Sequence, residues 1–163
     1  MDIDKIRAQI PATGECLYFN TGGIAPSHDV VTNSLVEEFR SIAQHGPPLI
    51  MDYARYSAQL QDARHRLATF CGVEARDLCL THGIADGVTT VFNGFDWHTG
   101  DELILTDEEH PAVKIPAEWL ALTHGVEIKY LPIDGTDADI LQRLDDCLTP
   151  RTRLLALSHV TTD

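Results

Sequence analysis

The chain has 163 residues, 44% of them hydrophobic, and a formal net charge of −13 at pH 7. A chain of this length and apolar content can bury a core, which excludes disorder as a description of the whole chain. Its 25 acidic side chains outnumber its 12 basic ones, so electrostatic repulsion disfavours nucleic acid and anionic lipid surfaces as partners.

The cysteines and the amino terminus indicate a reducing compartment. The four cysteines are Cys16, Cys71, Cys79 and Cys147, and their spacing forms no CxxC pair or zinc-binding pattern. Cys71 and Cys79 lie in apolar surroundings that predict buried thiols. The acidic amino terminus differs from a signal peptide, and no apolar run approaches the roughly 18 residues of a membrane span. We therefore expect a cytoplasmic protein with no membrane association.

The first part of the chain predicts an irregular arm and two helices. Residues 17–19 form a short apolar run that predicts a strand, and residues 20–23 read as a turn. A helical pattern opens at Ser27 or His28 and is stopped by the Gly-Pro-Pro run at residues 46–48. A second helix is expected from about Tyr56 to Phe70. We assign residues 1–55 to an amino-terminal arm and small-domain-like segment.

After residue 72 the pattern alternates regularly between strands and helices. Such alternation predicts an α/β fold, in which an open, mostly parallel sheet is joined by crossover helices. The last expected strand has no helix after it to cover its second face, so we expect residues 56–163 to be the first part of an incomplete large domain. The expected strands are residues 78–81, 102–106, 126–131 and 153–160, and the expected helices are residues 84–95, 111–123 and 136–147.

The turn after the first of these strands is a candidate phosphate site. Ligands of open parallel sheets bind beyond the carboxyl ends of the strands. Here Gly83 lets the backbone approach a ligand, and the amides of Gly83, Ile84 and Ala85 would point at one spot at the start of a helix. The alternative is an ordinary tight turn in which Asp86 stabilises the beginning of the helix.

Two further segments follow strand ends. His110 ends the acidic run at residues 107–109, where it could stack on a ligand ring or transfer protons. The alternatives are a charged helix start, or a divalent metal site built with Glu108 and Glu109. After the last strand, His159 could be a polar residue at a buried strand end, and Thr162 could donate a hydrogen bond to a ligand oxygen.

Taken together, these segments resemble the class V aminotransferase group of pyridoxal-phosphate (PLP) enzymes of fold type I, which includes cysteine desulfurases and isopenicillin-epimerase-like proteins. The resemblance covers nearly the whole chain and comes from the order of five motifs, none of which is specific alone. The motifs are the opening loop at residues 17–26, the phosphate turn at 80–86, Gly-Asp-Glu at 100–102, Glu-His-Pro-Ala at 109–112, and the segment from 149 to 160.

The resemblance assigns roles to single residues. It implies that backbone amides hold the cofactor phosphate, that a histidine stacks on the pyridine ring, that a threonine lies near the phenolic oxygen, and that a turn lines the substrate side. Ile84 and Ala85 stand where the family has hydroxyl residues, and Thr162 stands where it often has asparagine. The phosphate-binding amides would be those of Gly83, Ile84 and Ala85, and the stacking histidine would be His110. The threonine near the phenolic oxygen would be Thr162, and the turn on the substrate side would be Thr21, Gly22 and Gly23.

The resemblance also implies that an essential group lies outside the chain. PLP chemistry needs a Schiff-base lysine, and the lysines of this sequence, Lys5, Lys114 and Lys129, do not lie in the family's Ser/Thr-x-His-Lys setting. We therefore expect no catalytic residue in the isolated chain. We expect the amino-terminal portion of an enzyme acting on an amino acid, either homo-oligomeric or completed by a carboxyl-terminal chain. The alternative is a non-catalytic scaffold or regulatory subunit that binds no cofactor.

Overall fold

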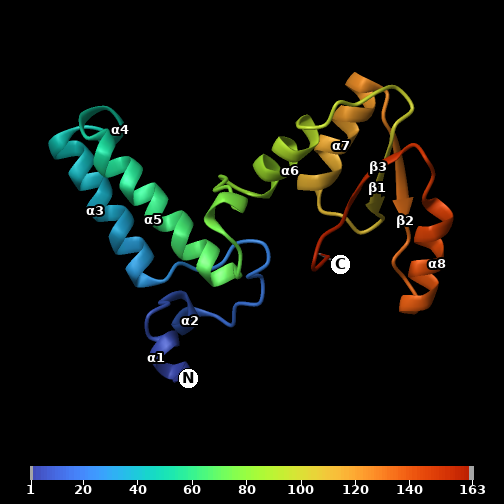
Figure 1. Ribbon diagram of the computed structural model, residues 1–163. Coiled ribbons are helices and arrows are strands. Elements are labelled where there is room, and N and C mark those ends of the chain that lie inside the picture. Colours follow the sequence, from blue (N-terminus) through green and yellow to red (C-terminus); the bar gives the residue numbers. More distant parts are fainter. Residues whose placement is uncertain (1, 162–163) are drawn as a thin grey trace. The chain divides into compact units, whose positions relative to one another are not determined.

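The computed structural model describes residues 2–161 and divides the chain into two compact units (Figure 1). Unit 1 is Met1–Cys79 and unit 2 is Leu80–Asp163. The boundary expected between residues 55 and 56 falls inside a helix, α5 (Tyr53–Cys71). The assignment of residues 1–55 to an arm and 56–163 to a cofactor-binding domain stays a prediction. No helix within residues 2–161 combines the length and the apolar character needed to cross a bilayer.

Unit 1 is helical. Its two long helices, α3 (Asp29–His45) and α5, lie where the sequence predicts them, and each begins at a side-chain cap. Nδ1 of His28 accepts from the amide of Val30 at 3.1 Å, and Oδ1 of Asp52 accepts from the amide of Arg55 at 3.1 Å. The elements are α1 (Ile3–Arg7), α2 (Ala12–Glu15), α3 (Asp29–His45), α4 (Pro48–Met51), α5 and the 3₁₀ helix η1 (Ala75–Asp77).

The apolar side chains of unit 1 are largely uncovered. Among its described residues only Ala68 is buried, whereas Phe39 is 70% and Phe70 is 87% exposed. The prediction that Cys71 and Cys79 are buried is wrong for the same reason, because both are exposed. Apolar neighbours in sequence predict burial only where another element packs over them.

Two of the predicted strands are absent. Residues 17–19 and 78–81 belong to neither a helix nor a sheet. A strand requires a ladder of backbone hydrogen bonds to a neighbour, and neither segment enters a ladder in the described part of the chain. In the first segment the hydroxyl of Tyr18 donates to the carbonyl of Ile24 at 2.5 Å, which closes a loop. Both strand predictions are therefore wrong.

Unit 2 confirms the α/β prediction. It is a parallel sheet of three strands in the order β2-β1-β3, one strand fewer than the sequence suggested. The helices alternate with the strands as expected. The elements are α6 (Ile84–Asn93), β1 (Glu102–Thr106), α7 (Pro111–His124), β2 (Glu127–Leu131), α8 (Asp137–Cys147) and β3 (Thr152–Ala156).

The strand order explains how the helices cover the sheet. The chain steps from β1 to β2 in one direction and from β2 back past β1 to β3 in the other. Right-handed crossovers then put α7 and α8 on opposite faces, as Figure 1 shows. Leu103 and Leu105 point to the core shared with α6 and α7, and Leu103, Ile104 and Leu105 are all 0% exposed. The central strand β1 is thus buried on both faces.

A buried ion-pair cluster closes the amino-terminal end of the sheet. The side chain of Glu102 is 0% exposed, and one of its oxygens lies 2.8 Å from Nζ of Lys129. The same oxygen accepts hydrogen bonds from Thr149 at 2.7 Å and Thr152 at 3.0 Å, while the other lies 2.7 Å from Nη2 of Arg151. These contacts tie β1 to β2 and to the start of β3. They lower the pKa of Glu102 to about 2, mainly through the hydrogen bond from Lys129.

Candidate functional site

The candidate site lies at the carboxyl end of the sheet in unit 2. The three strands are parallel, so the segments that follow them emerge at one edge. These segments are residues 107–110 after β1, 132–136 after β2 and 157–161 after β3. Ligands of such sheets bind at this edge.

The amino terminus of α6 presents a turn suited to a phosphate group. Gly83 is its N-cap in an extended conformation, and no side chain of the described residues caps the helix. The first helical bond runs from the amide of Gly87 to the carbonyl of Gly83 at 3.1 Å, so the amides of Ile84 and Ala85 precede the helical ladder. A side chain built on Gly83 would meet nothing within 4 Å, which leaves open space in front of the turn.

Asp86 stabilises this turn, as the alternative interpretation expects. Its Oδ2 accepts from the amide of His82 at 3.0 Å and lies 3.3 Å from Nδ1 of the same residue. These contacts lower the pKa of Asp86, the hydrogen bond from the backbone of His82 most of all. The turn is therefore held by its own side chain, and the carboxylate that could repel an anion is engaged with His82.

His110 is fixed at the junction between β1 and α7. It is exposed and is the N-cap of α7, and its Nδ1 accepts from the amide of Ala112 at 3.0 Å. Because Nδ1 is an acceptor, the proton of the neutral ring lies on Nε2. Pro111 occupies the first helical position, as the sequence predicts. The ring is thus held by the helix it caps at the ligand-binding edge.

Carboxylates tie the loop that carries His110 to both neighbouring strand ends. Oδ1 of Asp107 accepts from the amide of Ile133, after β2, at 3.2 Å. On the other side, Glu109 is 3% exposed and accepts two hydrogen bonds from Ser158, after β3. Sequence reasoning missed this role of Glu109. The available signal was the hydroxyl of Thr106 three residues before it, which also donates to Glu109 at 2.9 Å.

The metal-site alternative gains no support. Within residues 2–161, no group of three or more His, Cys, Asp or Glu side chains is placed to hold a metal ion. The oxygens of Glu109 are directed to Thr106 and Ser158, and Nδ1 of His110 is engaged with its own helix.

The remaining predicted residues lie elsewhere. Thr162 lies outside the described residues. Thr21, Gly22 and Gly23 form a turn in unit 1, where the amides of Gly23 and Ile24 both donate to the carbonyl of Asn20 at 3.2 Å. A Cβ at position 23 would lie 2.8 Å from Oδ1 of Asn20, so a larger residue there would displace the Asn20 side chain. The assignment of this turn to the substrate side stays a prediction.

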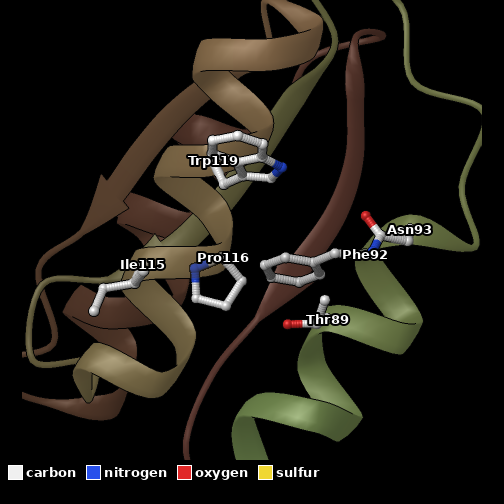
Figure 2. A pocket seen from close by; sticks show the side chains of 6 residues that line it. All are labelled: Thr89, Phe92, Asn93, Ile115, Pro116 and Trp119. Atoms are coloured by element: carbon white, nitrogen blue, oxygen red, sulfur yellow. The ribbon is translucent and has the colours of Figure 1, made fainter.

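A separate apolar groove of about 270 Å³ lies between α6 and α7 (Figure 2). Phe92 of α6 faces Pro116 of α7 across it. The lining contains no titratable side chain and none of the residues predicted for the site, so it offers no groups for acid–base chemistry. The lining residues are Thr89, Phe92, Asn93, Ile115, Pro116 and Trp119.

Curated relatives match nearly the whole chain at low identity. A probable cysteine desulfurase of Methanothermobacter thermautotrophicus is 24% identical over 162 residues, which are 98% of this chain and 40% of that protein. A cysteine desulfurase of Cronobacter sakazakii is 32% identical over 106 residues, covering 63% of this chain and 26% of the relative. The chain therefore spans well under half the length of these relatives.

Solved structures of PLP enzymes and cysteine desulfurases also match nearly the whole chain. The structure of C-DES with glycine covalently linked to its PLP cofactor superposes with a TM-score of 0.84 at 29% identity, over 95% of this chain and 41% of that one. A cysteine desulfurase of Escherichia coli shares the fold, with a TM-score of 0.73 over 95% of this chain and 40% of that one, at 24% identity. The family profile described as aminotransferase class-V matches residues 17–163. The chain therefore belongs to the class V aminotransferase family, whose cofactor is PLP, and has its α/β fold.

Proposed function

We propose that this chain is the amino-terminal portion of a PLP enzyme acting on an amino acid, as a lyase or desulfurase, an epimerase or a transaminase. The observation that carries the proposal is the open, glycine-capped start of α6, which lies in the same unit as His110, the residue proposed to stack on the pyridine ring. A phosphate dianion suits amides at a helix start, and the space in front of Gly83 leaves room for it. The residues present therefore fit the phosphate end of PLP.

The chain's own residues would act by binding and orienting. The amides of Gly83, Ile84 and Ala85 would hold the phosphate, and the ring of His110, locked by Ala112, would stack on the pyridine. Thr162 would lie near the phenolic oxygen, and Thr21, Gly22 and Gly23 would line the substrate side. Bound PLP withdraws electrons from the α-carbon of an amino acid.

Two of the three lysines in these 163 residues are engaged in contacts within unit 2, which supports a covalent partner beyond this sequence. Lys129 is paired with the buried Glu102, at the opposite end of the sheet. Nζ of Lys114 donates to the carbonyl of Asp107 at 2.8 Å. We therefore propose that the lysine and the pyridine-nitrogen partner come from residues beyond this sequence, in the same polypeptide or in a carboxyl-terminal chain, and that the active form is a homo-oligomer or such a complex.

The relatives suggest which substrate class to try first. One structural neighbour is the cystine C–S lyase C-DES in complex with its reaction product cysteine persulfide, at 29% identity and a TM-score of 0.84. Several curated relatives are cysteine desulfurases. We propose sulfur-containing amino acids as the first substrates to test.

A titration of the chain with PLP and with pyridoxal, followed by cofactor fluorescence, tests the proposal. We expect saturable binding of PLP, and pyridoxal about ten-fold weaker because it lacks the charge-assisted phosphate contacts. His110→Ala should weaken PLP binding, whereas His124→Ala, at the far end of the same helix, should not. Borohydride reduction should leave no specific covalent adduct on Lys114.

A second candidate, a scaffold or regulatory subunit with a degenerate fold, is favoured by Ile84 and Ala85, which lack the family's hydroxyl groups. It predicts no saturable PLP binding. Binding of PLP and pyridoxal with equal affinity would also contradict the enzyme proposal, because it would show that the start of α6 does not hold the phosphate.

A further inference from the structure

Glu109 is a buried carboxylate that bridges the ends of two strands. It is 3% exposed and follows β1 by three residues. Its Oε1 accepts from the hydroxyl of Thr106 at 2.9 Å and from the amide of Ser158 at 2.7 Å. Its Oε2 accepts from the hydroxyl of Ser158 at 2.6 Å. One side chain thus joins the carboxyl end of β1 to the segment after β3.

These contacts link two strands through a buried carboxyl group that has only uncharged donors among the described residues. Two hydroxyl groups and one amide all donate to the carboxyl group, so both of its oxygens act as acceptors. Within residues 2–161, no cationic side chain forms an ion pair with Glu109, in contrast to Glu102 at the other end of β1. Burying a carboxylate without a counter-charge is costly, and a neutral side chain could have joined the strands.

The position of Glu109 gives it a direct effect on its neighbour. His110 is the next residue, and its ring is oriented by the hydrogen bond from Ala112 at the start of α7. With the side chain of Glu109 anchored to Ser158, the peptide joining residues 109 and 110 is anchored as well. The loop is further tied to the end of β2 through Asp107 and Ile133.

We propose that Glu109 is a positioning residue that fixes the ring of His110 relative to Ser158, after the end of β3. The ring that would stack on the cofactor is then in place before the cofactor binds. This inference rests on the proposed function, because it is His110 that would face PLP. Glu109 itself touches neither cofactor nor substrate and acts through His110.

The ring nitrogens of His110 report on this role without any cofactor. In the full 163-residue chain, long-range ¹H–¹⁵N spectra identify which nitrogen carries the proton. We expect the wild type to show the Nε2–H tautomer, held by the Ala112 amide. Glu109→Gln keeps the size of the side chain but loses the charge and one acceptor. It should mix the tautomers and weaken PLP binding about ten-fold.

Matched variants separate positioning from stability. Glu108→Gln makes the same chemical change one residue earlier at a half-buried position, and should leave the His110 spectrum and the PLP affinity unchanged. Ser158→Ala removes only the bond to Oε2 and should give a smaller effect of the same kind, should Glu109→Gln unfold the chain. Ser158→Ala should have a smaller effect in the Glu109→Gln background than in the wild type, because the two side chains are in direct contact.

The proposal is overturned if Glu109→Gln and Ser158→Ala lower thermal stability while the His110 spectrum and PLP affinity stay at wild-type values. Glu109 would then be only a structural link between strands. Failure of the proposed function gives a different result: the wild-type chain would not bind PLP, while the His110 signals would still respond to Glu109→Gln.

Discussion

At the scale of single residues, two buried carboxylates lie at opposite ends of β1, and their burial is compensated in two different ways. Glu102 is neutralised by Lys129 and Arg151, whereas Glu109 is held by hydroxyl and amide donors. The first arrangement stabilises the sheet where no ligand is expected. The second leaves a carboxyl group with no ion-pair partner among the described residues at the edge where ligands of parallel sheets bind. Neither role is evident in the sequence, because Lys129, Arg151 and Ser158 are tens of residues away from the carboxylates that they contact.

The pKa of Glu102 predicts a pH dependence of stability. Its folded value of about 2 lies below the ordinary value of 4.5, so the folded state favours the ionised form. The resulting stabilisation is complete above about pH 4.5 and is lost as the pH falls toward 2. Lys129→Gln removes the largest cause of the shift. This variant should have a lower urea midpoint than the wild type at pH 7. Its urea midpoint should also fall less steeply than that of the wild type between pH 5 and pH 3.

Urea titrations monitored by circular dichroism across this pH range measure the effect. Lys5→Gln in α1 is the control, because it makes the same chemical change at an exposed position of unit 1. Equal pH profiles for the wild type and Lys129→Gln would show that Lys129 does not set the ionisation of Glu102.

At the scale of elements, sequence periodicity predicted α3, α5 and the alternation of unit 2 well. These elements carry their own signals: capping residues, glycine stops such as Gly72 and Gly125, and apolar spacing. The failures at residues 17–19 and 78–81 have one cause. A strand depends on a partner that local sequence does not specify, whereas a helix satisfies its own backbone.

The start of α8 allows a test of one local signal. Thr136 and Asp139 form a capping box: the Thr136 hydroxyl is 3.3 Å from the Asp139 amide, and the Asp139 carboxylate accepts from the Thr136 amide at 3.1 Å. Thr136→Ala should cost about 1 kcal/mol in the free energy of unfolding. Thr123→Ala, where the hydroxyl bonds back to Trp119 inside α7, should cost less. Chemical denaturation measures both, and equal losses would contradict the assigned role of the cap.

The candidate site was predictable only in part. The sequence indicated the turn at residues 83–85 and His110 as candidates, because glycine and histidine stand out after predicted strands; their roles at the cofactor stay predictions. Asp86 was expected to stabilise the start of the helix, and it holds the turn through His82. The use of Glu109 as a bridge was not predictable, because it depends on the contact with Ser158, which is distant in sequence.

At the scale of the whole molecule, the two units differ in how much they bury. Unit 2 contains a packed cluster around Phe92, Leu103 and Leu105, whereas in the described part of unit 1 only Ala68 is buried. Under limited proteolysis we expect the first cuts in unit 1 and a protected fragment that begins near Leu80. Leu105→Ala should cost about 2–5 kcal/mol and abolish this protection.

Mass spectrometry of the digest locates the cuts, and Leu122→Ala serves as the control because Leu122 is 79% exposed and contributes little burial. A protected fragment that includes α3 and α5 would contradict this expectation, since it would show that the long helices are as resistant to opening as the sheet.

The uncovered helices of unit 1 also have a calorimetric consequence. The heat capacity increment of unfolding follows the apolar surface newly exposed to water, and Phe39 and Phe70 are already 70% and 87% exposed in the folded chain. Melting α3 and α5 should therefore add little to the increment, which would come mostly from unit 2. When another surface covers these helices, the same residues should contribute in full, so the increment measures how completely unit 1 is covered.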